Sequence, residues 1–288
     1  MADYIIYADS ACDLDRKYFE EWNVKRVDLH FSFMDEGAEY ADGAIPYADF
    51  YRKMREGKIA KTSAVATGDF KDAFRADCEA GRDILYLGFS SGLSGTFNSG
   101  RLAMDELREE FPDVKLIAVD SLSASTGYGL LLYLAVQKRD EGATIEELEK
   151  FLIDTRLHLC HWFTVDDLVY LKRGGRINPA VAFVGGVLGI KPVLHVDDYG
   201  HLVNVSKARG RKAAIKALAD HYTEIASDPE HGTVMICHGD CPFDAAQLAG
   251  ILRERHGAKV KIISYTGTVI GAHSGPGTLA LFFLGDKR

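Results

Sequence analysis

The stretch ILYLGFSSGLSGT, residues 84–96, decides the fold class of this chain. Residues 84–89 are apolar enough to form a buried strand, and apolar residues then recur from Phe97 to Phe111 with the spacing of one helix face. A turn rich in glycine and hydroxyl groups therefore connects a strand to a helix. Free backbone N–H groups and the positive end of the helix dipole at such a turn favour a carboxylate or a phosphate.

Ser94 is the candidate contact residue of this turn. It lies where the N-cap of the helix is expected, and its small neighbours Gly95 and Thr96 allow a ligand to come close. A serine at this position is equally typical of a plain helix cap. The turn alone therefore leaves both interpretations open.

Two further segments favour the ligand interpretation. The stretch TSAVAT, residues 62–67, is a second hydroxyl-rich turn, and a helical pattern follows it. Near the other end of the chain, GAHSGPG, residues 271–277, sets His273 among three glycines and a proline, which predicts a rigid turn. We therefore expect Thr62, Ser94 and His273 to form parts of one anion-binding site.

The first half of the chain repeats one structural unit. Strands over residues 4–8, 84–89 and 116–119 each end in a turn that contains serine, and a helical pattern follows each turn. This repetition predicts a parallel sheet with helices on both faces, and such sheets bind ligands beyond the carboxyl ends of their strands. The spacing from Thr144 to Glu147 is a capping box, which predicts a further helix start.

The second half shows different patterns. A DDYG turn at residues 197–200 separates two strand-like stretches and predicts a hairpin, and helical patterns alternate with three further strands. We therefore predict an α/β fold of two domains, residues 1–158 with a parallel sheet and residues 159–288 with a mixed sheet. The apolar, glycine-containing segment 178–189 is either a buried core helix or one wall of an apolar tunnel.

Composition narrows the classes of function. The 288 residues carry a formal charge of -8, which argues against nucleic acid as a partner because phosphate binding needs concentrated Lys and Arg. Five scattered cysteines indicate a reducing compartment, and the pair Cys237 and Cys241 is too weak a pattern for a metal site. The sequence shows no secretory leader and no apolar run of ~20 residues, so we expect a soluble, cytoplasmic protein without integral membrane association.

Five segments, in this order and spacing, carry a resemblance to a known family. They are DSACDL at 9–14, SSGLSGT at 90–96, DSLSAS at 120–125, FTVDDLVYLKRGGRI at 163–177 and HSGPG at 273–277. With them the chain resembles the DegV family, the fatty-acid-binding subunits of bacterial fatty-acid kinase. The matching segments span almost the whole chain.

The resemblance implies both a fold and a function. A Rossmann-like first domain and an α/β second domain are expected to hold a long-chain fatty acid in a tunnel between them, without a cofactor or a metal. The protein is then a carrier rather than an enzyme. A separate kinase phosphorylates the bound carboxylate to an acyl phosphate, which serves phospholipid metabolism.

The expected ligand and partner contacts can be assigned to individual residues. Those implied at the carboxylate are Thr62, Ser94, Gly95, Thr96 and His273. Those expected along the acyl tunnel are Phe183, Val187, Leu188 and Ile190. Arg173 is implied in contact with the kinase, and Arg176 is expected there too because the fixed guanidinium geometry suits oxyanions; a solvated basic turn is the alternative for both. Residues 62–66 read TSAVA where the family has Thr-Ser-Gln-Pro-Ser, which leaves the preferred acyl chain open.

Two alternative functions stay open. GLSGT at 92–96 resembles the Gly-x-Ser-x-Gly turn of serine hydrolases, with Ser94 and His273 as the reacting pair, although no acid is marked as the partner of the histidine. The second alternative is a small-ligand phosphotransfer protein similar to the substrate domain of dihydroxyacetone kinase. Because the sequence has no Gly-x4-Gly-Lys-Ser/Thr nucleotide loop, phosphoryl transfer requires a partner chain.

Overall fold

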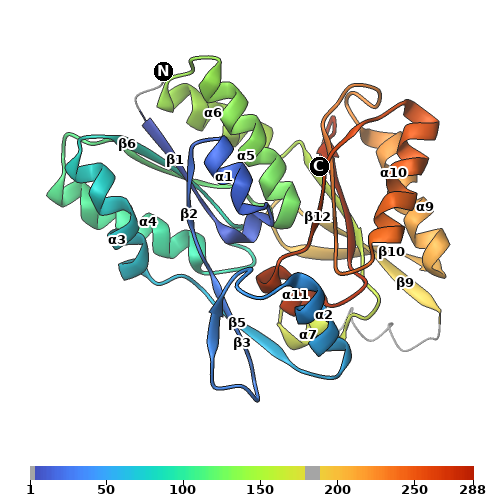
Figure 1. Ribbon diagram of the computed structural model, residues 1–288. Helices are drawn as coiled ribbons and strands as arrows, with labels where there is room; N and C mark the ends of the chain where they lie inside the picture. Colours follow the sequence, from blue (N-terminus) through green and yellow to red (C-terminus); the bar gives the residue numbers. More distant parts are fainter. Residues whose placement is uncertain (1–3, 179–188) are drawn as a thin grey trace.

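The computed structural model describes residues 4–178 and 189–288 of the chain (Figure 1). The described residues form three sheets, which confirms the predicted α/β fold. A four-stranded sheet takes its strands from residues 4–120, a six-stranded sheet from residues 159–284, and a three-stranded sheet from residues 30–63. The predicted domain boundary at residue 158 falls in the turn just ahead of the first strand of the six-stranded sheet.

The four-stranded sheet is parallel throughout, as its sequence pattern predicts. Its strands, in spatial order, are β2 (Val24–Val27), β1 (Tyr4–Asp9), β6 (Asp83–Gly88) and β7 (Leu116–Asp120). Helices cover both faces, α3 (Thr67–Glu79) and α4 (Thr96–Glu110) on one, α5 (Ser125–Asp140) and α6 (Ile145–Thr155) on the other (Figure 1). The short helices η1 (Ser10–Cys12) and α1 (Arg16–Glu21) connect β1 to β2. The predicted capping box is present, since Thr144 Oγ1 accepts a hydrogen bond from the N–H of Glu147 (3.2 Å).

The serine-bearing turns meet at the carboxyl edge of this sheet, also as predicted. The carboxylate of Asp9 accepts a hydrogen bond from the backbone N–H of Phe89 (2.8 Å). The carboxylate of Asp120 accepts one from the N–H of Ser91 (3.2 Å), and the N–H of Ser90 donates to the carbonyl of Ser123 (2.9 Å). These bonds fix the turn at residues 90–96 relative to its neighbours.

The six-stranded sheet is mixed, as predicted. Its order is β10 (Leu202–Arg209), β9 (Ile190–Val196), β8 (Leu159–Thr164), β13 (Leu279–Leu284), β11 (Val234–His238) and β12 (Val260–Tyr265). Only the pairing of β11 with β12 is parallel. Helices α9 (Arg211–Ile225) and α10 (Pro242–His256) cover the face that points away from the first sheet (Figure 1).

Helix α5 lies between the two large sheets and joins them. It packs against β8, β11 and β13 of the second sheet. On its other side the Tyr128 hydroxyl accepts a hydrogen bond from the N–H of Asp9 (2.9 Å) and donates to the carbonyl of Leu87. Gly127 permits the close packing of α5 against the second sheet, because a Cβ at this position would lie 2.5 Å from the ring of Phe282 in β13. The helix is apolar on most of its circumference, as expected for a helix buried on both sides.

The three-stranded sheet was not predicted from the sequence. It is antiparallel, in the order β4 (Glu39–Ala41), β3 (His30–Phe33) and β5 (Ala60–Ser63). Two helices pack against it, α2 (Tyr47–Arg55) and α11 (Thr268–Ser274), and their contacts form a separate aromatic cluster. Strands of three or four residues are too short for an alternating pattern to be recognised. This small sheet matters because its strand β5, which contains Thr62, packs against α11.

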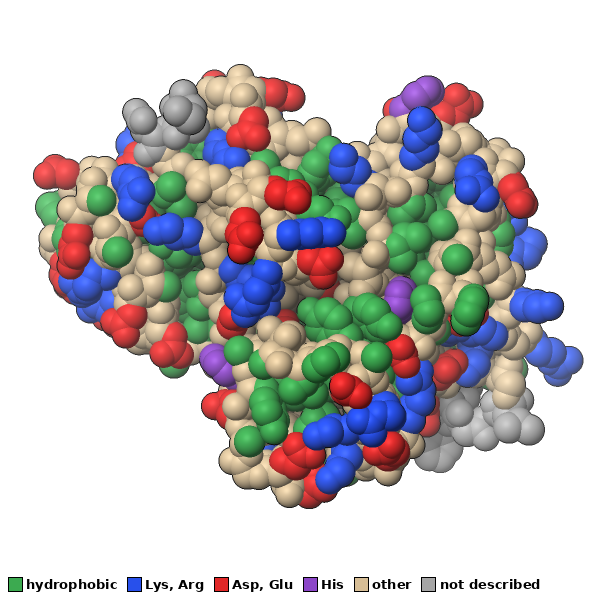
Figure 2. All heavy atoms as spheres, viewed as in Figure 1, with side chains coloured by type: hydrophobic (Ala, Val, Ile, Leu, Met, Phe, Trp, Pro, Cys, Tyr) green, Lys and Arg blue, Asp and Glu red, His purple; other side chains and the backbone are tan. Residues whose placement is uncertain are grey.

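The surface carries charges of both signs. On the face shown in Figure 2, Lys and Arg side chains are interspersed with Asp and Glu and form no continuous basic area. Among the helices of the described residues, none combines the length and the apolar composition needed to cross a bilayer.

Arg288 ties the two halves of the chain together, and its removal is expected to destabilise the fold. Its guanidinium donates to the carbonyls of Leu122 (3.0 Å), Leu159 (3.1 Å), Asp197 (2.9 Å) and Arg156 (2.5 Å). We expect Arg288→Ala to lower the free energy of unfolding by about 3 kcal/mol, since four carbonyls lose a charged donor. Urea denaturation measures this change, with the exposed neighbour Lys287→Ala as the control. Equal stability of both variants would show that these bonds contribute little.

Candidate binding cavity

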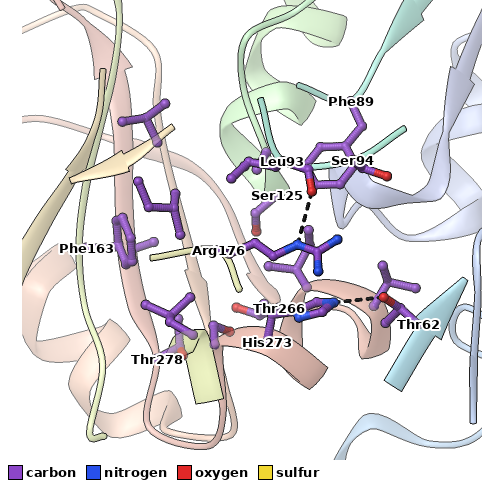
Figure 3. A pocket seen from close by; sticks show the side chains of 18 of the residues that line it. Thr62, Phe89, Leu93, Ser94, Ser125, Phe163, Arg176, Thr266, His273 and Thr278 are labelled. Carbon is purple, nitrogen blue, oxygen red and sulfur yellow. Dashed lines mark hydrogen bonds between the residues drawn. The ribbon is translucent and has the colours of Figure 1, made fainter. Parts of the chain in front are cut away.

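A cavity of about 150 Å³ lies between the carboxyl edge of the first sheet, β5, α11 and the second sheet. Most of its described wall is apolar, formed by residues such as Leu29, Phe89, Leu93, Phe163, Leu171, Val196, Leu202, Val269, Ile270 and Phe282. Hydroxyl groups, an imidazole and a guanidinium gather at one end, which we call the polar end: Thr62, Ser94, Arg176 and His273 (Figure 3). No Asp or Glu belongs to the described wall.

Thr62 and His273 meet at the polar end from opposite halves of the chain. Thr62 Oγ1 lies 2.8 Å from His273 Nε2, a hydrogen bond across 211 residues of sequence (Figure 3). The prediction that both lie in turns is wrong: Thr62 belongs to β5, and His273 to the last turn of α11. A helix of seven residues that contains Gly271 is too short to show a helical pattern. The rigid turn begins only at Gly275, whose φ of 80° favours glycine.

His273 is held neutral by its surroundings. Burial and the nearby charge of Arg176 lower the pKa of His273 to about 4. The imidazole of His273 packs directly against the backbone of Gly174. Only glycine leaves room for it, because a Cβ at position 174 would lie 2.1 Å from His273 Nδ1. A neutral imidazole offers one donor and one acceptor, so His273 can accept a proton when an anion enters beside it.

The lowered pKa of His273 predicts an acid-sensitive fold in the absence of ligand. In the unfolded chain His273 binds a proton near its ordinary pKa of 6.5, whereas in the folded protein His273 binds a proton only near pH 4. The stability that the protein has with His273 neutral is therefore fully present above pH 6.5, and it is lost as the pH falls towards 4 and protonation favours the unfolded chain. Thermal unfolding measures this effect: between pH 7 and pH 4, the Tm of His273→Gln should fall less than the Tm of the parent protein. An identical pH profile would contradict a buried neutral His273.

Ser94 lies on the cavity wall, one residue earlier than predicted relative to the helix. Helix α4 begins at Thr96 with Gly95 as its N-cap, so the expectation that Ser94 is the N-cap is wrong. Ser94 Oγ accepts from the N–H of Thr96 (3.2 Å) and lies 3.0 Å from its hydroxyl. Ser94 and Gly95 line the cavity, whereas Thr96 is fully buried behind them. Thr96 therefore orients the Ser94 hydroxyl from outside the described cavity wall.

Arg176 lies inside the polar end, whereas the sequence predicts it at a partner surface. Its Nε donates to the carbonyl of Leu93 (3.1 Å; Figure 3), which bridges the two halves of the chain. Its Nη1 donates to the carbonyl of Gly174 (2.5 Å). Burial lowers the pKa of Arg176, and no carboxylate of the described residues forms an ion pair with it. By contrast, Arg173 is exposed at the end of α7 (Val169–Arg173), with its guanidinium over the ring of Tyr170.

The predicted tunnel residues are only partly covered by the structure. Phe183, Val187 and Leu188 lie outside the described residues. Ile190 opens strand β9 and is not among the residues that line the described cavity. The apolar residues that do line it were not expected from the sequence, because the ten named above come from eight separate elements and loops.

The geometry of the polar end suits binding of an anion rather than hydrolysis. A serine hydrolase needs a hydrogen bond from its serine to the histidine and an acid behind the histidine. Here Ser94 bonds to Thr96, His273 bonds to Thr62, and the described wall contains no acid. Within residues 4–178 and 189–288, no three His, Cys, Asp or Glu side chains come together as a metal site.

Comparisons with known proteins agree on one family. The family model described as uncharacterised protein, DegV family, matches residues 4–286. A DegV domain-containing protein of Clostridium perfringens is 42% identical, with 100% of this chain and 99% of that protein covered. A fatty acid-binding protein of Thermotoga maritima is 34% identical over 95% of both. The solved structure of a fatty-acid-binding DegV family protein from Thermus thermophilus superimposes with a TM-score of 0.89, at 29% identity and with 98% and 99% covered.

Proposed function

The chain belongs to the DegV family, and on that premise we propose that it binds one long-chain fatty acid in the cavity, with the carboxylate at the polar end. The observation that carries the proposal is the half-buried guanidinium of Arg176, which has no acidic partner in the described part of an otherwise mostly apolar cavity. Such a charge is stabilised by an anion. The proposed carboxylate contacts are Thr62, Ser94, Gly95, Arg176 and His273.

The energetics of an acyl chain support this ligand class. A carboxylate removed from water needs hydrogen bonds and a positive charge, which the two hydroxyls, the imidazole and Arg176 supply. The acyl chain of the ligand contributes about 0.8 kcal/mol per buried CH₂, so an acyl chain of sixteen carbons offers roughly 10 kcal/mol before the costs of binding are subtracted. The related proteins from Thermotoga maritima and Thermus thermophilus are named for fatty-acid binding, which supports the same assignment.

A titration tests this binding directly. The delipidated protein is mixed with a long-chain fatty acid, and calorimetry follows the heat of binding. We expect one equivalent to bind with micromolar or tighter affinity, while a hydrocarbon alcohol of equal length binds more weakly because it lacks the charge. Equal affinity for acid and alcohol would mean that the polar end does not recognise a carboxylate.

We further propose that the protein presents this carboxylate to a separate kinase, as the family resemblance implies. The sequence contains no Gly-x4-Gly-Lys-Ser/Thr loop, so phosphoryl transfer requires a second protein. Arg173 supports this role because it is exposed, while Arg176 three residues later reaches the carboxylate. An exposed guanidinium suits a phosphate or an acidic side chain of a partner.

The substitution Arg173→Ala is expected to separate binding from phosphorylation. Fatty-acid affinity should stay within about twofold of the parent, since Arg173 does not line the described cavity. Acyl-phosphate formation with a fatty-acid kinase should slow by about tenfold if one charged contact to the partner is lost. Radiolabelled phosphate transfer measures the rate. Unchanged turnover by the kinase would remove Arg173 from the interface.

A further inference from the structure

Two buried carboxyl groups, Asp13 and Asp42, lie at the amino-terminal end of α11, and a third, Asp9, lies at the end of β1; none belongs to the described cavity wall. Asp9, Asp13 and Asp42 are each at most 5% exposed. Arg26 is the cation close to all three, and its Nε is already bonded to Asp28 (2.5 Å). Among the described residues more buried acids than cations therefore meet here, which favours a proton on one of the carboxyl groups.

Asp13 and Asp42 differ in the hydrogen bonds that they accept. Asp42 Oδ1 accepts from the N–H (2.9 Å) and the hydroxyl (2.6 Å) of Thr268, the first residue of α11. Asp13 Oδ2 accepts from the Ser125 hydroxyl, whereas Asp13 Oδ1 has no hydrogen bond of good geometry in the described structure. Both Oδ1 atoms face Gly267, where a Cβ would lie 2.5 Å from Asp13 and 3.2 Å from Asp42. Asp42 is thus stabilised as an anion, and Asp13 is the group suited to hold the proton.

The electrostatic surroundings agree with this assignment. Burial raises the pKa of both carboxyl groups, and the charge of Asp42 raises the pKa of Asp13 further. Among the described residues, the other titratable groups that face the pair from the packed elements are Cys12, Arg26, Tyr47, Tyr51 and Cys237. Burial raises the pKa of the thiols and phenols of this set, so they stay uncharged at neutral pH.

The position of the pair in the fold links it to the binding cavity. Asp13 follows η1 and Asp42 precedes α2, so both belong to the first half of the chain, while α11 belongs to the second. The same helix carries His273 at its other end. We propose that Asp13 and Asp42 form a proton-dependent clamp on α11, which retains the ligand while Asp13 is protonated and loosens when the two carboxylates repel each other. This inference rests on the proposed fatty-acid binding and adds control of release by pH.

The direction of the pH effect follows from linkage. A carboxyl group with a raised pKa stabilises the closed state most at low pH, and this contribution is lost as the pH rises through that raised value. Ligand release should therefore accelerate at alkaline pH, by at most about tenfold per pH unit for one linked proton. In Asp13→Asn, a neutral side chain of the same size faces Asp42, so release should stay slow at every pH.

The test measures release of a fluorescent long-chain fatty acid into phosphatidylcholine vesicles between pH 6 and pH 10. The parent protein should release it faster as the pH rises, while Asp13→Asn should show a flat profile. Asp42→Asn also removes one of the two charges, so it should likewise show a flat profile. If Asp13→Asn does not fold, the profile of Asp42→Asn tests the clamp in its place. Asp77→Asn is the control, because Asp77 is a buried carboxylate paired with Lys25 and Arg82 and is expected to keep the parent profile.

Each remaining outcome has a distinct meaning. A flat profile for the parent protein, or the same rising profile in both Asp13→Asn and Asp42→Asn, would overturn the clamp while fatty-acid binding stands. Failure of the parent protein to take up the fatty acid at any pH would overturn the proposed function itself.

Discussion

Replacement of Arg176 by alanine is expected to weaken fatty-acid binding by roughly 30- to 150-fold, which corresponds to about 2 to 3 kcal/mol. Arg176 supplies the positive charge of the polar end, and the described wall offers no second cation to replace it. Its Nε also holds the carbonyl of Leu93, so the variant loses a bond between the turn at residues 90–96 and the second half. Most of the loss should appear as faster dissociation, since the acyl chain still enters the same apolar cavity.

Two matched variants make the result specific to the charge at this position. Arg176→Lys keeps the charge without the planar fork and should recover part of the affinity. Arg173→Ala removes an exposed guanidinium three residues away and should bind normally. Normal binding by Arg176→Ala would mean that the carboxylate lies elsewhere, and loss of binding by Arg173→Ala would point to a general disturbance of this segment.

Substitution of Gly174 by alanine is expected to displace His273 and to reduce fatty-acid affinity about tenfold or more. A Cβ at this position would stand 2.1 Å from His273 Nδ1, well inside van der Waals contact. The backbone itself accepts alanine, because φ and ψ of Gly174 are -72° and -12°. The cost is therefore steric and acts on the imidazole, which must leave its hydrogen bond with Thr62.

A double-mutant cycle identifies the imidazole as the site of the conflict. In the His273→Ala background the added methyl group meets no ring, so Gly174→Ala should cause little further loss of affinity. Gly250→Ala is the control, because Gly250 lies within α10 and a Cβ there contacts nothing within 4 Å. Equal losses from Gly174→Ala with and without His273 would show that the glycine acts through some other contact.

The sequence was informative where local patterns are long. Residues 84–96 form the expected strand, turn and helix, and the capping box at Thr144 is present. Both sheet types follow from the order of strands and helices, because sequential strand–helix units favour parallel pairing and a short hairpin favours antiparallel pairing. The serine turns at one edge of the first sheet follow from the same rule.

Other parts depend on contacts that no local pattern contains. The three-stranded sheet has strands of three or four residues, and α11 has only seven, so neither produces a readable period. The sequence predicts Arg176 at the kinase interface, whereas the chain folds back and places it on the cavity wall beside His273, a contact that no local pattern contains. The pairing of Asp13 with Asp42 likewise depends on tertiary packing between segments far apart in sequence.

The most direct test of fatty-acid binding is mass spectrometry of the freshly purified protein, first native and then denatured, with the released small molecules identified. We predict an excess mass in the native spectrum that matches one long-chain fatty acid, recovered in one equivalent after denaturation. The Arg176→Ala protein should carry less of it. A native protein without bound lipid, which also takes up no added fatty acid, would contradict the account and favour a small polar ligand for the cavity.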